Sequence, residues 1–464
     1  MRPRFIVSLA RPFALVAAAL SGLLLVAAAR PHATLVSSEP AANSHVATAP
    51  TRVRLVFSEP VEGGTARIAL VPANGTPITL RAASDPRNVN AVIAPTDSLP
   101  AGAYKVEWRV VSADGHTVAG AFSFAFGDTT LGTSGTLADT AAAEPGVSES
   151  VVADPEPVME DELWGPSAYG APLIPAFFRG AALGTLMAAA GVLLFFALAD
   201  PNAAQIGCPR VGRVTTTLLV VAPVLLAAHV VTWIINTSPE HTFDTAWAGA
   251  ALGTTVGKIE LWRTGLALLA LWAWWLARRP KLALVFAVAA LAVSGATGHS
   301  AAMQPFVSIP AKAVHLLASG VWAGGLVWLI VRPTADSPRL FVQDTNRVST
   351  LALIAVIAVA VTGFLQTILF LPSISDVFTS PYGWIALAKT AGFFVLAGFG
   401  AYHRQRAMPR MEASLSEMDF AILRRSVRRE ITVMIGVILL GGLLAYTPPP
   451  EDGALMPPSP TASR

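Results

Sequence analysis

Eight apolar segments, each near the roughly 20 residues that a bilayer-crossing helix needs, dominate this 464-residue chain beyond residue 172. Hydrophobic residues make up 53% of the chain and charged residues only 13%, which is too apolar for a soluble enzyme. We therefore predict an all-α polytopic membrane domain over residues 166–448. The predicted spans lie at about 173–199, 211–236, 259–277, 281–298, 311–331, 348–371, 382–402 and 430–447.

Basic residues fall in alternate loops between these segments. By the positive-inside rule, the loops that carry them are cytoplasmic. The other loops and the Pro-rich tail at 449–464 are then extracytoplasmic, which predicts a multi-pass protein of a bacterial inner membrane. The basic loops carry Arg210 and Arg213, then Arg278, Arg279 and Lys281, then Arg332, Arg339 and Arg347, and last the run from Arg404 to Arg429.

Residues 1–31 have the layout of a secretory signal, with arginines followed by an apolar run and small residues. An uncleaved signal anchor is the alternative, and both export the segment that follows. Cleavage after Ala29 is favoured, because Pro31 directly before His32 disfavours a cut at that point. The mature chain then begins at Arg30.

Residues 32–127 change to a period of two, which is typical of half-buried strands. Tyr104, Val106 and Trp108, for example, alternate with more polar residues. Turn residues separate roughly seven such strands, so we predict an all-β sandwich. Residues 128–165 contain nine Asp or Glu and no Lys or Arg, which predicts an acidic flexible linker.

Candidate metal ligands occur in the predicted sandwich. Asp114 and His116 are two residues apart at a strand end, so both point to one face of an extended chain. His32, near the predicted mature amino terminus, is a third candidate. Imidazole and carboxylate donors favour Cu(II), although Asp-x-His pairs also cap turns. His45 lies between polar residues, and we expect it to be solvated.

Further candidates lie in or beside the apolar spans, all on the predicted extracytoplasmic side: His229, His241, His299, Met303 and His315. Ionisable groups within a span cost a few kcal/mol and are functional candidates. A helical turn would place His299 and Met303 on one face, a pairing that suits Cu(I). For the histidine at 315, metal or cofactor ligation and a hydrogen-bonded structural role both stay open.

Several classes of function are disfavoured by what the sequence lacks. Cys208 is the single cysteine, so neither an internal disulfide nor a cysteine-pair metal site is available. No phosphate-loop motif occurs, and nothing suggests ATP-driven pumping or an enzyme. The net charge of +3 is small and spread over loops, which argues against a nucleic-acid partner.

Two parts of the sequence resemble known families. LVSSEPAANSHVATAPTRVRLVFSEPV and SADGHTVAGAFSFAFG resemble the CopC copper-resistance family, and ATGHSAAM, AKAVHLLASGVWAGGL, AVTGFLQT and YGWIALAKT are similar to the CopD integral-membrane family. The resemblance implies a CopC-CopD fusion with a Cu(II) site at His32, Asp114 and His116. The Met-rich Cu(I) loop of some relatives is missing, which implies a Cu(II)-only sandwich. Because the histidine follows Arg30-Pro31, we expect it to bind through its side chain without a terminal amine.

These observations lead to three hypotheses. In the first, the sandwich captures copper and passes it to the membrane domain for transport, inward as the CopD resemblance implies. The expected ligands there are His299, His315, Met303 and His229. The expected partners are copper ions, the lipid bilayer and a periplasmic copper chaperone. The second is a membrane haem or quinone redox protein, because the intramembrane cations Arg179, Arg263 and Lys389 would repel a metal cation. The third is a copper sensor or assembly factor without net transport.

Overall fold

The computed structural model describes residues 33–73, 75–112, 117–127, 173–198, 209–238, 241–298, 305–332, 338–371, 373–447 and 449–450. The chain forms two compact units, one built on the amino-terminal strands and one on the long helices. The predicted signal segment, the linker at 128–165 and nearly all of the predicted tail lie outside the described residues. Those expectations stay predictions.

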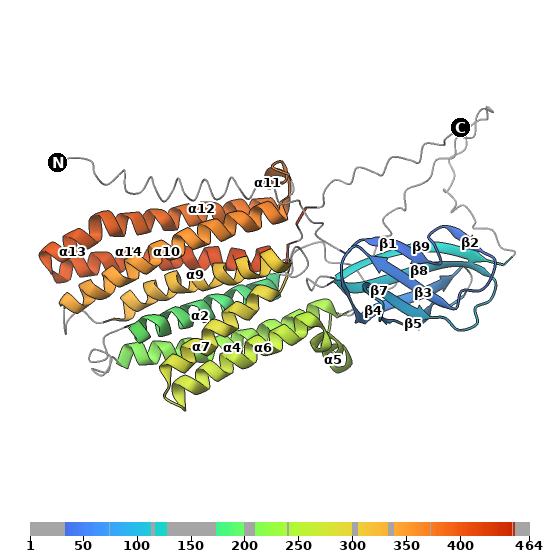
Figure 1. Ribbon diagram of the computed structural model, residues 1–464, viewed down its shortest axis with the longest axis horizontal. Coiled ribbons are helices and arrows are strands. Elements are labelled where there is room, and N and C mark those ends of the chain that lie inside the picture. The colour runs from blue at the N-terminus through green and yellow to red at the C-terminus, as the bar shows by residue number, and fades with distance from the viewer. Residues whose placement is uncertain are drawn as a thin grey trace. The chain divides into compact units, whose positions relative to one another are not determined.

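Nine strands occupy the described part of residues 33–127 (Figure 1). We expected roughly seven, and the excess comes from short strands such as β2 and β6, whose three residues are too few to show a period. The strands are β1 (Leu35–Glu39), β2 (Ser44–Val46), β3 (Arg52–Phe57), β4 (Val61–Pro72), β5 (Ile78–Arg81), β6 (Ala83–Asp85), β7 (Asn88–Pro95), β8 (Gly102–Ser112) and β9 (Thr117–Phe126).

The strands form two sheets, with the orders β1-β3-β7-β6 and β2-β9-β8-β4-β5. The described strand pairs are antiparallel, except that β2 runs parallel to β9. Alternate residues of β3 are buried, as the period of two predicts. Phe57 of one sheet meets Trp108 of the other edge to face, with ring centroids 5.2 Å apart, so the core lies between the sheets. The predicted β-sandwich is confirmed.

Helices occupy all eight of the predicted apolar ranges. Proline at the first position of α7 and α12 suits a helix start, where its missing N–H costs nothing. The long helices are α2 (Leu173–Leu198), α4 (Pro209–Thr237), α6 (Thr255–Trp275), α7 (Pro280–Val293), α9 (Pro305–Val331), α10 (Pro338–Phe370), α12 (Pro381–Tyr402) and α14 (Glu417–Leu444). Short helices are α5 (Thr245–Gly253), η1 (Ser294–Ala296), α11 (Asp376–Thr379), η2 (His403–Ala407) and α13 (Met408–Ser414).

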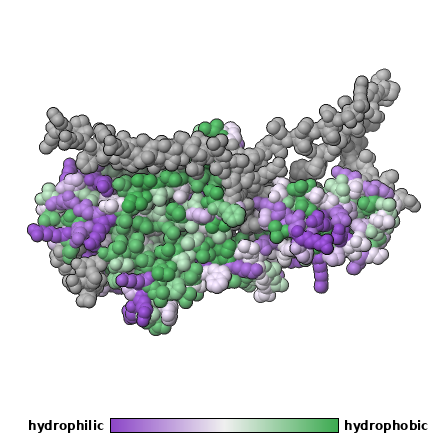
Figure 2. All heavy atoms as spheres, viewed as in Figure 1, coloured by the Kyte–Doolittle hydropathy of each residue, from purple (hydrophilic) through white to green (hydrophobic). Residues whose placement is uncertain are grey.

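Within the described residues, five helical stretches are long and apolar enough to cross a membrane: α2, α4, α9, α10 and the stretch from α12 to α13. The predicted count of eight spans is not confirmed, because α7 is shorter and α6 contains Lys258, Glu260 and Arg263. Figure 2 shows hydrophobic residues over the middle of the bundle and hydrophilic residues at the end that carries α13. This distribution suits a protein whose outer surface faces lipid.

Helices α2 and α9 pack closely because glycines face each other. A Cβ atom added at Gly324 would lie 2.2 Å from the Cα of Gly191, and one added at Gly191 would lie 2.1 Å from the carbonyl oxygen of Gly320. Any larger side chain would separate the helices. The close packing fixes α9, which carries two of the candidate polar groups, against the centre of the bundle.

Candidate functional site

Buried polar side chains gather at one end of the bundle, the end at which α2, α6, α9 and α12 begin and α4, α7, α10 and α14 end (Figure 1). We call this the polar end. The positive-inside rule predicts that it is extracytoplasmic. Charged groups are costly in a bilayer unless they are paired or hydrogen-bonded, so the arrangement of their partners is informative.

The centre of the polar end is formed by His229 of α4 and Glu260 and Arg263 of α6. All three are at most 1% exposed. The carboxylate of Glu260 pairs with the Nη2 group of Arg263 one turn away, and its Oε1 atom lies 3.7 Å from Nε2 of His229. Nδ1 of the imidazole lies 3.2 Å from the carbonyl oxygen of Pro175. The glutamate therefore stands between a histidine and an arginine.

A second group of cations meets at the end of α7. The hydroxyl of Thr297 accepts a hydrogen bond of 2.9 Å from Nη2 of Arg179, and its carbonyl accepts one from Nζ of Lys312. The next residue, Gly298, has a φ of +69°, a conformation that side chains rarely adopt. A Cβ atom there would lie 3.6 Å from the guanidinium and 3.8 Å from the ammonium. Gly298 thus lies between two positive charges.

Tyr446, after α14, links these two groups. Its ring centroid lies 6.1 Å from that of His229 and 5.9 Å from Cζ of Arg179. The guanidinium over the ring is a cation–π contact, which partly offsets the cost of burying the charge. The linked groups carry three cations, Arg179, Arg263 and Lys312, against the single carboxylate at position 260.

His315 lies on α9, about one helical turn after Lys312. Its Nδ1 atom is 3.0 Å from the hydroxyl of Thr362 on α10, and Gly363 leaves room for the ring, since a Cβ there would be 3.5 Å from Cε1. Thr362 itself donates to the carbonyl oxygen of Ala358. The hydroxyl can then accept from Nδ1, which leaves Nε2 as the atom able to hold a metal.

The structure brings two of the four predicted membrane ligands, His229 and His315, to the same end of the bundle, on α4 and α9. His299 and Met303 lie outside the described residues, and His241, four residues after α4, is exposed. Among the residues that the structure describes, no group of three His, Cys, Asp or Glu side chains is close enough to hold a metal. The membrane ligand set stays a prediction.

The opposite end of the bundle carries a separate buried network. Trp322 of α9 donates a 2.9 Å hydrogen bond from Nε1 to Oε1 of Glu430 on α14. Nδ1 of His403 lies 3.2 Å from the other carboxylate oxygen, and its Nε2 is 2.8 Å from the hydroxyl of Ser426. This network joins three helices and supports a structural role for the histidine at 403.

In the sandwich, the predicted ligands His32, Asp114 and His116 lie outside the described residues, but the residues that flank them meet at one turn. The backbone N–H of Thr34 donates to the Ser58 hydroxyl over 3.0 Å. Ser112 donates from its own hydroxyl to Oε1 of Glu59 over 2.5 Å. The turn at Ser58–Glu59 therefore holds both the start of the domain and the end of β8.

Sequence reasoning missed the buried acids Glu59 and Glu260 and the half-buried Lys312. Glu260 was detectable in principle, because it lies three residues before Arg263 in an apolar range, a spacing that pairs charges on a helix. Glu59 gives no such signal, since Ser-Glu-Pro is an ordinary turn sequence. Elsewhere in the sandwich, Nε2 of His45 lies 2.6 Å from the Gly127 carbonyl oxygen, and the side chain stays exposed, in keeping with the prediction.

The comparisons with known proteins match both units. The CopC domain family matches residues 35–127. The family called copper resistance protein D-like, N-terminal domain, matches residues 171–308, and copper resistance protein D matches residues 342–444. The three matches follow one another along the chain and together include the strands and most of the long helices.

Two relatives identified by sequence agree with these matches. Over 451 residues the chain is 24% identical to the copper transport protein CutJ of Bacillus subtilis, covering 92% of this chain and 76% of that protein. It is 38% identical over 113 residues to copper resistance protein C of Pseudomonas syringae pv. tomato, covering 22% of this chain and 87% of that protein. The crystal structure of CopC from Methylosinus trichosporium OB3b aligns with 31% identity and a TM-score of 0.20, over 21% of this chain and 95% of that one.

The fold and its buried sites define a multi-pass membrane protein joined to a β-sandwich. The chain belongs to the CopC copper-resistance family through its sandwich and carries a CopD-type membrane domain in the same polypeptide. Families of this kind bind and transport copper, and the predicted CopC-CopD fusion is confirmed.

Proposed function

We propose that this protein captures Cu(II) at the rim of its sandwich and transfers copper to the polar end of the bundle for passage into the cell. The observation that carries the proposal is the buried pair formed by His229 and Glu260, two metal-ligating side chains that face each other inside the bundle. The histidine at 315, whose Nε2 is available at the same end, is the next ligand along the route.

The hydrogen bonding of His229 makes the pair suitable for a cation. Because the Pro175 carbonyl only accepts hydrogen bonds, geometry assigns the ring proton to Nδ1. In the neutral ring, Nε2 then presents a lone pair to Oε1 of Glu260, 3.7 Å away. Two metal–ligand bonds of about 2 Å span up to roughly 4 Å, so a metal ion between the two atoms is within reach. Imidazole and carboxylate are donors that suit Cu(II).

In the sandwich, the turn at Ser58–Glu59 supports a shared site for His32, Asp114 and His116. Thr34, two residues after His32, is hydrogen-bonded to Ser58 of this turn. Ser112, two residues before Asp114, is hydrogen-bonded to Glu59. The buried carboxylate of Glu59 adds an oxygen donor at the same turn. We infer that these four side chains form a Cu(II) site of nitrogen and oxygen ligands.

The surplus of cations at the polar end favours a second candidate function. Arg179, Arg263 and Lys312 would repel a bare copper ion, whereas they would attract haem propionates or a quinone. An absorbance spectrum of the purified protein separates the two. A Soret band or a bound quinone would support the redox function, and copper bound without either supports transport.

Transport is tested by measuring copper accumulation in cells that express the wild type or one of the variants His229→Ala, His299→Ala and His315→Ala at matched levels. The proposal expects each variant to accumulate less copper than the wild type. His241→Ala is the control, because this histidine follows α4 by only four residues but is exposed, and the variant should accumulate copper normally. Equal accumulation in all of the strains would remove these histidines from the route. Binding without accumulation even in the wild type would indicate a sensor or assembly factor.

A further inference from the structure

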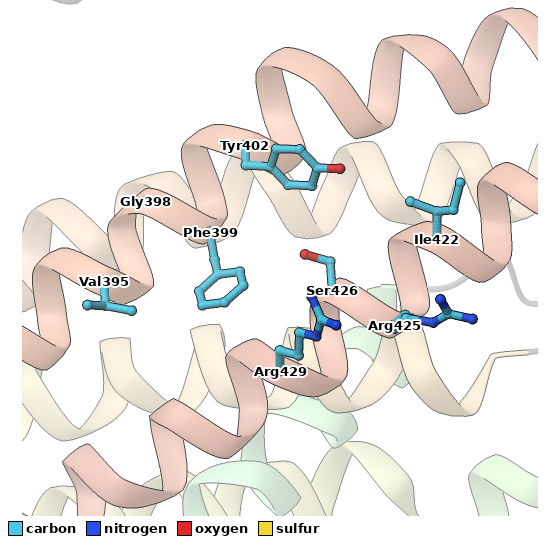
Figure 3. Close-up of a pocket in the computed structure, with 8 residues that line it drawn as sticks. All are labelled: Val395, Gly398, Phe399, Tyr402, Ile422, Arg425, Ser426 and Arg429. Atoms are coloured by element: carbon cyan, nitrogen blue, oxygen red, sulfur yellow. The ribbon is translucent and has the colours of Figure 1, made fainter.

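A surface groove lies between α12 and α14, at the opposite end of the bundle from the polar end. Figure 3 shows its lining, with Phe399 and Tyr402 of α12 on one side and Arg425, Ser426 and Arg429 of α14 on the other. Its volume is about 460 Å³. The groove is separate from the copper route proposed above, and none of the predicted metal ligands lines it.

One part of the groove is positively charged. Arg425 and Arg429 are four residues apart on α14, so they lie on the same face of the helix, and both are exposed. Within the described part of the chain, neither forms an ion pair with an acidic side chain. Like charges at this spacing repel each other, and a bound anion between them would relieve that repulsion. The hydroxyl groups of Tyr402 and Ser426 add hydrogen-bonding groups beside the two cations.

The other part of the groove is apolar and faces outward. Val395 is 51% exposed and Ile422 is 44% exposed, so an apolar wall is left uncovered by the protein. In the 18-residue apolar window of the stretch that begins with α12, only 6% of the residues are buried in the bundle. In a membrane protein such a face contacts lipid chains. The groove therefore combines exposed apolar residues with two cations along its α14 side.

We infer that this groove binds the phosphate headgroup of an anionic phospholipid. The acyl chains would lie along Val395 and Phe399 while the phosphate contacts Arg425 and Arg429. A free phosphate would use the cations but leave the apolar wall exposed, and a zwitterionic lipid would bring a positive group to two arginines. The charge and the apolar wall together select an anionic lipid.

The floor of the groove connects to the buried network at this end. Ser426 lies 2.8 Å from Nε2 of His403, which starts the π-helical turn η2, and this imidazole is beside Glu430. π-Helical turns are frequent at functional sites. A phosphate bound at the hydroxyl would thus contact a residue of the network that joins α9, η2 and α14.

The test uses the full-length protein in detergent, titrated with phosphatidylglycerol, with phosphatidylcholine or with inorganic phosphate, and followed by native mass spectrometry. We expect phosphatidylglycerol to bind at least tenfold more tightly than phosphatidylcholine. At about a fivefold effect for each arginine near an anionic surface, Arg425→Ala/Arg429→Ala should weaken phosphatidylglycerol binding about 25-fold. Arg425→Lys/Arg429→Lys, which keeps the charge, should retain most of the affinity.

Arg406→Ala/Arg428→Ala is the matched control, because it removes the same charge from the same end of the bundle but not from the groove. Its binding should change by less than about threefold, whereas removing a contact should cost about fivefold for each arginine. Thermal unfolding without added lipid checks that all three variants fold. An equal loss of affinity in the control pair, equal binding of phosphatidylcholine, or binding of inorganic phosphate at the same concentration would each overturn the assignment.

Discussion

The two units bury charged side chains in different surroundings. The sandwich encloses an apolar core between its sheets, and the turn that flanks its predicted copper ligands lies at the rim. The bundle instead buries Glu260, Arg263 and His229 among its helices. The sandwich also buries charged side chains such as Glu59 and Asp85, but beside an apolar core that drives its folding, while the bundle depends on pairing charges that a membrane would otherwise exclude.

The largest effect should come from the core of the sandwich. Phe57→Ala removes a ring that is 2% exposed and packs edge to face on Trp108, so we expect a loss of about 4 kcal/mol in the free energy of unfolding. Urea denaturation of residues 32–127 produced alone measures it. Phe57→Leu is the control and should lose less than about 1.5 kcal/mol. If the separate domain does not fold, the sandwich is not independent of the bundle.

In the bundle, Glu260→Ala should cost about 3 kcal/mol, because it leaves the guanidinium of Arg263 buried without its carboxylate. The change in the free energy of unfolding is measured by titrating the protein in mixed detergent micelles with sodium dodecyl sulfate. The double variant Glu260→Gln/Arg263→Met removes both charges and should recover most of the stability. A double variant as unstable as the single one would show that the ion pair is not the cause.

Copper binding at the rim should depend on histidine side chains. We expect His116→Ala to weaken Cu(II) binding by the full-length protein at least 100-fold. Replacing a residue that only hydrogen-bonds to a metal ligand already lowers metal affinity about 10- to 100-fold. A competition titration with a Cu(II) chelator measures it. His45→Ala, which alters an exposed histidine of the same domain, should leave the affinity unchanged. Comparable losses in the two variants would exclude the histidine at 116 as a specific ligand.

The smallest effect concerns pH. The pKa of Asp85 is lowered by the backbone N–H of Arg87 and by the guanidinium of Arg54, whose Nε lies 2.8 Å away. A lowered pKa in the folded state contributes stability above the unfolded value, near 3.9, and this contribution is lost as the pH falls through the folded pKa. Urea denaturation of the sandwich at pH values from 7 to 3 measures this. The free energy of unfolding should fall less on acidification in Asp85→Asn than in the wild type. Identical pH profiles would contradict this.

Much of the fold was predictable from the sequence because it rests on periodicity. The alternation along β3 predicted which side chains are buried, and the apolar runs marked the ranges that eight helices occupy. Strand number was less predictable, because strands of three residues such as β2 show no pattern. The number of spans was also uncertain, since α6 and α14 mix apolar residues with charges.

The candidate site was less predictable, because it depends on contacts between distant segments. The sequence indicated that His229 and His315 lie toward one side of the membrane, and the structure places them at one end of the bundle. The sequence did not indicate that Glu260 faces His229. Nor did it indicate that Thr297 accepts hydrogen bonds from both Lys312 and Arg179, the second of which is 118 residues away in the sequence. Such partners become visible only when the helices are packed together.

The central claim is that copper passes through the polar end of the bundle. Uptake of radiolabelled copper into proteoliposomes that contain the full-length protein tests it most directly, with Cu(II) binding by the sandwich measured on the same samples. We expect the wild type to accumulate copper in the lumen of the vesicles. In His229→Ala and His315→Ala, the sandwich should bind Cu(II) normally, but little copper should accumulate in the lumen. Uptake by both variants at the wild-type rate would contradict the claim.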